Sequence, residues 1–237
     1  MEQLVGILIK VLLFAFIAGM FTLVFVVARR GRMKAQQIND DYAQLARIAP
    51  ERGWTYALCV RGQIDQYAGV GPFPGVCQNL RAWHYTTGEI RGHSFKFFEF
   101  RYNNPLSSES GERKRPIIES VFILTTPGSA PSTEIYHPDM LDSVTDWRTK
   151  VQLGMPEFDS EFRIATKDEA FARAVLCGEL VSLLLADPRA KASRIALRDN
   201  VAITWFTGTM SAQAADEKLN YLCDVLERIP AQAWTAA

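Results

Sequence analysis

The hydrophobic positions of this chain form one long run near the N-terminus and shorter periodic groups after it. The run extends from Leu4 to Ala28 and contains a single charge, Lys10. At about 1.5 Å rise per residue, the uncharged residues 11–28 cover roughly 27 Å, close to a hydrocarbon core of about 30 Å. We therefore predict a transmembrane helix over residues 4–28, preceded by a short external N-terminus, residues 1–3.

Four basic residues follow this run directly: Arg29, Arg30, Arg32 and Lys34. The other flank carries only Glu2 and the amino group of the chain. Positive charge marks the cytoplasmic side of a span. The pattern predicts a single-pass protein of the inner (plasma) membrane, with its N-terminus outside and its main domain cytoplasmic. The four basic side chains are also candidate contacts for anionic lipid headgroups. The alternative is a core helix of a soluble fold, in which the basic cluster would be difficult to pack.

Small side chains share one face of the predicted span: Ala15, Ala18, Gly19 and Thr22 lie at i, i+3, i+4 and i+7. Small residues let helices approach closely. This face is therefore a candidate surface for packing against a helix of a polytopic membrane protein. The alternative is that glycine and alanine are simply frequent in membrane spans.

Residues 29–50 join the basic cluster to a predicted juxtamembrane helix. Its apolar positions recur at helical spacing up to Pro50: Ile38, Tyr42, Leu45 and Ile48. The stripe is one residue wide, and two aspartates on the polar face would be repelled by anionic lipids. We expect this helix to pack as the first helix of the domain, with the headgroup region as the alternative.

We predict a β-rich lobe over residues 51–135. Its β structure is expected to end between Pro127 and Pro131. Strand composition is found at 54–60, 81–87, 92–102 and 117–126. In the third of these segments, the alternation of apolar and polar positions shifts by one residue between Phe97 and Phe98. This change indicates either a β-bulge there or a central strand covered on both faces. Residues 69–76 read as a surface turn or lid, and residues 103–116 as an exposed loop.

After an irregular connection over residues 136–157, residues 158–237 predict a β-α-β-β-α lobe. It begins with a strand at 158–164. A helix follows, which Thr166 and Glu169 cap at its start and which runs to about residue 186. A hairpin follows at 195–205, with residues 198–200 as its loop and Asn200 left-handed. The last helix begins near Ser211 and is stopped by Pro230.

Composition narrows the function classes. The 26 basic and 26 acidic residues balance, which excludes a large sequence-independent attraction to nucleic acid. The four cysteines are widely spread, as expected of free thiols in the cytoplasm. We predict no catalytic residue, no metal site and no cofactor, because no motif for any of them is present. An enzyme would require a pocket where side chains from a small set converge: His84, Glu89, His93 and Glu99.

The pattern also carries a family resemblance. Its signatures are GWTY at residues 53–56, GEIRG at Gly88 to Gly92, the aromatic strand FKFFEFRY, and the order of elements. The chain resembles the actinobacterial single-pass membrane protein family that includes the trehalose monomycolate transport factor. The resemblance implies a bilobed α+β fold, an antiparallel sheet-and-helix sandwich similar to PsbP. It also implies a non-enzymatic role beside an RND-type lipid transporter of the cell envelope.

The leading hypothesis is therefore a membrane-anchored cytoplasmic accessory or scaffold protein that supports a polytopic lipid exporter. One alternative is a peripheral module that senses lipids at the inner leaflet. A second is an enzyme of envelope lipids. The sequence leaves open whether the chain forms homo-oligomers.

Overall fold

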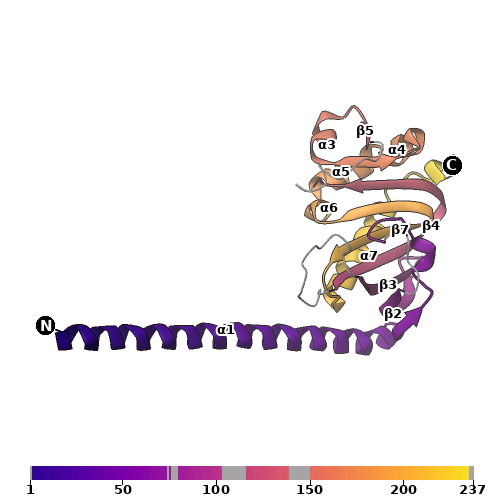
Figure 1. Cartoon of the computed structure of the whole chain (residues 1–237). Helices are drawn as coiled ribbons and strands as arrows, with labels where there is room; N and C mark the ends of the chain where they lie inside the picture. Colours follow the sequence, from indigo (N-terminus) through magenta and orange to yellow (C-terminus); the bar gives the residue numbers. More distant parts are fainter. Residues whose placement is uncertain (1, 74, 76–79, 103–115, 139–149, 235–237) are drawn as a thin grey trace.

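The computed structural model describes the backbone of residues 2–73, 75, 80–102, 116–138 and 150–234, and their side chains except those of 2–13, 15, 17, 18 and 150. The fold is mixed α+β, as predicted. A seven-stranded antiparallel sheet runs in the order β1-β2-β3-β4-β6-β5, with β7 pairing β4. Helices pack against this sheet, and one helix, α1 (Glu2–Glu51), extends away from the domain (Figure 1).

Helix α1 joins two elements that the sequence analysis separates. The predicted span and the juxtamembrane helix are one continuous helix of 50 residues, because Pro50, the helix's only proline, falls in its last turn. The transmembrane prediction itself is not supported. Within the described part of the chain, no helix combines the length and hydropathy that a membrane crossing requires. The C-terminal end of α1 packs into the domain as predicted, with Leu45 and Ala49 fully buried.

The first three strands form an antiparallel meander: β1 (Thr55–Arg61), β2 (Arg81–Ile90) and β3 (His93–Tyr102), with a short 3-10 helix, η1 (Asp65–Tyr67), after β1. Strand β3 is a central strand covered on both faces. Phe95 and Phe97 lie in one hydrophobic core, and Phe98 and Phe100 in the other. Of the two alternatives for the change of phase at Phe97 and Phe98, the central strand is therefore confirmed. The register of β3 with β4 is continuous, which excludes a bulge in β3, and the irregularity lies in the facing segment of β2.

The two cores lie on opposite faces of the sheet. The helix-side core joins β3, β4 and β7 to helices α1, α4, α5 and α7. The loop-side core is smaller, and Ile64, Tyr67, Val70 and Phe73, from the segment after β1, cover it. This segment includes the first half of the predicted surface turn, so part of that turn is a covering layer.

Two long strands, β4 (Ile117–Tyr136) and β7 (Arg194–Thr207), pair along most of their length. The strand predicted at 117–126 continues to Tyr136, so the prediction that the β-rich half ends between Pro127 and Pro131 is wrong. The missing amide hydrogens of the prolines are accommodated where the β4–β7 register shifts, between Thr125 and Thr133. The predicted hairpin at 195–205 is also wrong: β7 passes through this region as one strand, and its left-handed residue is Asp199, with a φ of 51°, rather than Asn200.

The other half of the sheet carries short elements. They are β5 (Lys150–Val151), α3 (Pro156–Glu161), β6 (Arg163–Thr166), α4 (Glu169–Val175), α5 (Gly178–Ala186) and α6 (Pro188–Lys191). The strand predicted at 158–164 is a helix followed by a strand, because Pro156 starts α3 and the Asp159 carboxylate accepts three backbone N–H groups before it. The single helix predicted to residue 186 is interrupted after Val175. Asp168, not Thr166, caps it.

The C-terminal elements agree with their predictions. Helix α7 (Ala212–Leu226) begins after Ser211, whose hydroxyl accepts a hydrogen bond from Ala214 N–H at 3.1 Å. A short 3-10 helix, η2 (Ala231–Trp234), follows Pro230 and returns Trp234 to the helix-side core. Among the cysteines that the structure describes, Cys59, Cys177 and Cys223 are free thiols, as predicted; Cys77 lies outside the described residues.

Candidate functional site

The described apolar side chains on the first half of α1 are exposed. They include Phe14 and Phe21, 76% and 72% exposed, and extend to Val27. Gly19 and Thr22 of the predicted small-residue face are exposed too, and a Cβ added to Gly19 would meet no atom within 4 Å. The side chains of Ala15 and Ala18 lie outside the described residues. A contiguous exposed apolar surface of this kind marks contact with a protein or a membrane.

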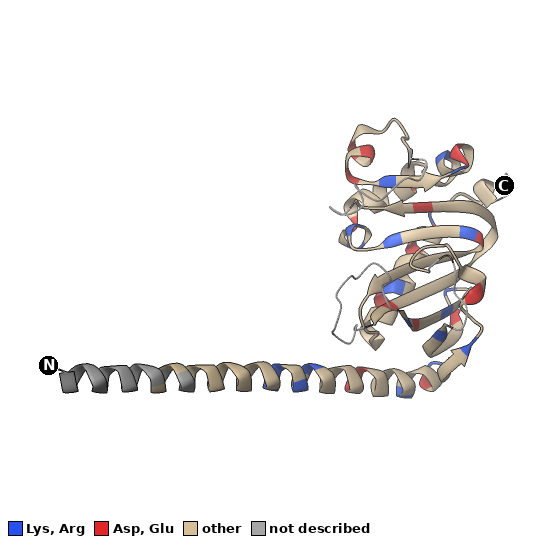
Figure 2. Ribbon diagram, viewed as in Figure 1, with Lys and Arg blue, Asp and Glu red and all other residues tan. Residues whose placement is uncertain are grey.

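The predicted basic cluster follows this apolar segment along the same helix. Arg29, Arg30, Arg32 and Lys34 are all exposed. In Figure 2, the ribbon of α1 changes from tan to mainly blue where the basic cluster follows the apolar segment. The structure therefore places the candidate headgroup contacts on an open surface next to the apolar segment.

The junction of α1 with the domain is built around a buried carboxylate, Glu99 of β3. Its side chain is 0% exposed, and both of its oxygens lie 2.9 Å from the hydroxyl of Tyr42, which donates to them. Met210 N–H donates to the same carboxylate at 2.5 Å. Glu99 thereby ties α1 to the segment that leads into α7.

Burial raises the pKa of both polar groups at this junction. Desolvation raises the pKa of Glu99 above its usual value, while the hydrogen bonds from Met210 and Tyr42 and the charge of Arg101 act against this rise. Burial and the Glu99 carboxylate both raise the pKa of the Tyr42 hydroxyl, which keeps that donor protonated. The contact between them is therefore a donated hydrogen bond in a region of low dielectric, where such bonds are strong.

His84 completes the junction from β2. Its ring stacks on Tyr42 with 3.8 Å between ring centroids, and its Nδ1 lies 2.8 Å from the hydroxyl of Tyr56. The residue has a φ of 52° and lies in the irregular part of β2, so its backbone is strained for a non-glycine residue. Burial, and secondarily the charge of Arg101, lower the pKa of His84 to about 4.

Of the four groups named for an enzymatic pocket, the structure brings two together. His84 and Glu99 both contact Tyr42, beneath the helix rather than at an open surface. His93 instead places its Nδ1 3.2 Å from the carbonyl oxygen of Thr125, and Glu89 pairs with Ser94 in the β2–β3 ladder. Sequence reasoning missed the role of Tyr42, which it treated only as part of an apolar stripe.

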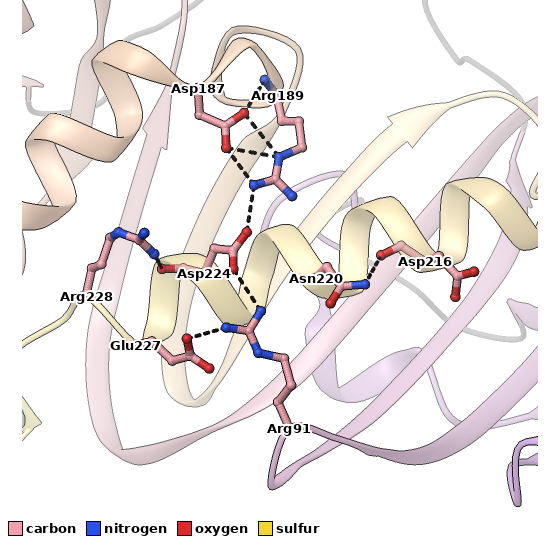
Figure 3. Close-up of polar contacts among 8 residues, drawn as sticks. All are labelled: Arg91, Asp187, Arg189, Asp216, Asn220, Asp224, Glu227 and Arg228. Atoms are coloured by element: carbon pink, nitrogen blue, oxygen red, sulfur yellow. Dashed lines mark hydrogen bonds and ion pairs between the residues drawn. The ribbon is translucent and has the colours of Figure 1, made fainter.

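A network of charged side chains joins the β2–β3 turn and the start of α6 to α7 (Figure 3). Arg91, at the β2–β3 turn, donates to Asp224 of α7 at 2.8 Å and also pairs with Glu227. Arg189 of α6 bridges Asp187 and Asp224, each at 2.6 Å. These arginines hold the pKa of Asp224 below its usual value although burial opposes this. Arg91 and Arg189 lie 133 and 35 positions from Asp224 in the sequence, a proximity that periodicity cannot reveal.

A cleft of about 550 Å³ lies between the loop Gly69–Gly71 and the sheet. Residues of β4 and β6 form its other wall, among them Thr133 and Thr166, whose hydroxyl oxygens are 3.0 Å apart. Gly71, with a φ of 55°, packs so closely on Trp205 that a Cβ there would lie 2.9 Å from its ring. The volume is typical of small-molecule sites. Lys167 is the cationic residue among those that line the cleft.

No protein-family model and no curated protein matches the sequence. A crystal structure of the mycobacterial trehalose monomycolate transport factor A, TtfA, is similar, with a TM-score of 0.57 and 14% sequence identity. The alignment covers 81% of this chain and 96% of that chain. At this identity the likeness shows the fold alone. It agrees with the resemblance seen in the sequence without assigning the chain to a family.

Proposed function

We propose that this protein is a non-catalytic accessory component of a lipid transporter in the cell envelope. The observation that carries the proposal is the first half of α1, whose described apolar side chains are exposed along a helix that leaves the domain. Exposed apolar surface of this extent is stable only when a protein or lipid covers it. The fold is similar to that of the mycobacterial trehalose monomycolate transport factor A, and this likeness supports a partner concerned with lipids.

In this proposal the apolar segment packs against the membrane helices of a polytopic transporter. The face with Gly19 has the open space that close helix packing requires. The basic cluster from Arg29 to Lys34 lies next to it and faces anionic headgroups. The domain, tied to α1 through Tyr42 and Glu99, is held at a fixed position beside the transporter. Its cytoplasmic orientation stays a prediction from the basic flank.

Affinity purification in a mild detergent tests the proposal. The full chain and a version lacking residues 1–28 are purified in parallel, and their partners are identified by mass spectrometry. We expect a polytopic lipid transporter with the full chain and its loss in the truncated one. Partners retained by the truncated chain would place recognition in the domain. Absence of any such transporter from both samples would refute the proposal.

A matched pair of variants locates the contact on α1. Gly19→Leu fills the small-residue face, whereas Gly31→Leu adds the same side chain at another open position of the helix. Neither substitution meets a neighbouring atom, so neither should disturb the fold. We expect recovery of the transporter to fall with Gly19→Leu alone. Equal recovery with both variants would remove the small-residue face from the proposal.

The lipid-sensing alternative has its own observation, the exposed basic cluster together with the cleft beside Gly69–Gly71. Binding through exposed charges weakens with salt, because the Debye length falls from about 10 Å at 0.1 M to about 3 Å at 1 M. Sedimentation with anionic and with neutral vesicles at both salt concentrations separates the two functions. Binding that requires anionic lipid and disappears in salt would favour the sensor.

A further inference from the structure

A second pocket, of about 320 Å³, lies between the end of α6 and the two ends of β7. It shares no lining residue with the cleft beside Gly69–Gly71. Its wall includes side chains that can donate hydrogen bonds: His137, Lys191, Ser193, Arg194 and Thr207. A wall with this many donors suits a ligand that is rich in acceptor oxygens.

One residue of this wall, Ser193, is hydrogen-bonded to a buried lysine of α7. Lys218 Nζ donates to Ser193 Oγ at 2.7 Å, and the two residues are 6% and 5% exposed. The carboxylate of Glu217 lies 3.9 Å from Nζ, beyond hydrogen-bond distance. Among the described residues, the other two ammonium hydrogens of Lys218 therefore have no acceptor. A buried ammonium with so little compensation is costly unless an anion comes near it.

The other cations of the wall already face carboxylates. Lys191 Nζ lies 2.7 Å from Glu161, and Arg194 lies 3.7 Å from Glu134. Lys218 differs from both. Desolvation lowers its pKa, and the opposing effect of Glu217 is smaller. This direction is the one expected of an ammonium that is short of negative charge.

We infer that this pocket binds the phosphate group of a small phosphorylated ligand. Because Ser193 Oγ accepts from Lys218, its own proton points elsewhere, and no described residue accepts it. A phosphate oxygen at the wall would accept this proton and would be attracted by the ammonium one hydrogen bond away. A phosphate has more acceptor oxygens than a carboxylate, which suits donors on several sides. The volume also leaves room for the organic part of an ester.

The pair is better suited to binding than to catalysis. Some hydrolases use a serine nucleophile with a lysine base, and they also need free N–H groups to hold the oxyanion. Here the backbone N–H of Ser193 donates to the carbonyl oxygen of Ala190 at 3.3 Å. It is therefore not available for that role. The inferred site goes beyond the proposed function and does not depend on it.

Isothermal titration calorimetry of the full chain in detergent tests the pocket. Inorganic phosphate, glycerol phosphate and acetate are titrated at an ionic strength held constant with chloride, so that general screening is the same for all three. We expect saturable binding of both phosphates and at least tenfold weaker binding of acetate. Phosphate should also raise the melting temperature, because a ligand that binds the folded chain stabilises it.

Three variants locate the binding. Lys218→Met removes the buried charge and Ser193→Ala removes the hydroxyl donor, and each should weaken phosphate binding at least tenfold. The matched control is Lys167→Met, which changes a lysine of the separate cleft and should leave phosphate binding unchanged. Melting in chloride without phosphate checks that each variant is folded. If Lys218→Met does not fold, Ser193→Ala decides.

Sedimentation with vesicles identifies the source of the phosphate group. Vesicles of phosphatidylcholine alone are compared with vesicles that also contain phosphatidic acid, for the unmodified chain and for Lys218→Met. The basic cluster of α1 is present in both proteins, so the difference between them reports on the pocket. Weaker binding of Lys218→Met to phosphatidic acid would indicate a lipid headgroup. Equal binding, with saturable binding of glycerol phosphate, would indicate a soluble ester.

The inference is overturned if neither the calorimetry nor the vesicles show binding that depends on Lys218. Acetate that binds as tightly as phosphate would also overturn it. None of these measurements depends on recovery of a transporter. A failure of the phosphate site and a failure of the proposed function can therefore be told apart.

Discussion

Acidification should destabilise the domain through His84. The ring is buried at 5% exposure, and burial lowers its pKa from 6.5 to about 4. When the pKa of a histidine is lower in the folded state, its contribution to stability is fully present at pH values above its pKa in the unfolded chain. That stability is lost as the pH falls from 6.5 to about 4. At about 1.36 kcal/mol per pKa unit, the loss amounts to about 3 kcal/mol.

The assay compares the full chain with His84→Asn by urea unfolding in detergent at several pH values, followed by tryptophan fluorescence. Asparagine tolerates the positive φ of this position and does not titrate, so the backbone is preserved while the pH effect is removed. Between pH 7 and pH 4, we expect the free energy of unfolding of the unmodified chain to fall by about 3 kcal/mol more than that of His84→Asn. His93→Asn controls for loss of a histidine outside the junction. Parallel curves for the unmodified chain and His84→Asn would refute the reasoning.

Three further substitutions test other contacts. Tyr42→Phe removes a donor from buried Glu99 and should cost about 2 kcal/mol in urea unfolding; a loss below about 0.5 kcal/mol would contradict a structural role for this bond. Asp224→Asn weakens both arginine bridges and should cost about 1 kcal/mol, less in high salt, since its side chain is 23% exposed; a salt-independent effect would contradict an ionic origin. Gly71→Ala should cost about 1 to 2 kcal/mol, because its φ is 55° and its Cβ would strike a tryptophan ring. An unchanged melting temperature would contradict this close packing.

The sequence predicts those parts of the fold whose signal is local. Helix α7 follows from its apolar stripe, its Ser211 cap and the proline that stops it. The apolar stripe of the predicted juxtamembrane helix correctly gives its packing into the domain. Errors arise where tertiary pairing overrides a local signal. The Asp199 bend looks like a hairpin because a left-handed residue between two apolar runs is typical of a turn, yet β4 holds both runs in one strand.

The candidate junction could be predicted only in fragments. His84 and Glu99 were named from their residue types, but their meeting point depends on Tyr42, more than 40 residues earlier in the chain. A tyrosine in an apolar stripe gives no sign that its hydroxyl reaches a buried carboxylate. The arginine network has the same limitation, because Arg91 and Arg189 reach Asp224 from elements whose proximity to α7 is fixed only after the sheet forms.

The continuity of α1 changes what the junction can do. A flexible link between the apolar segment and the domain would let the domain rotate freely, and a buried polar contact at its end would then have no mechanical consequence. Instead, the helix between Ala28 and Tyr42 is unbroken and spans about 21 Å at 1.5 Å per residue. Tyr42 is held by Glu99, which also binds Met210 next to α7. A shift of the apolar segment must therefore either move the whole domain or break this buried hydrogen bond. Since breaking it costs about 2 kcal/mol, small displacements are transmitted to the domain.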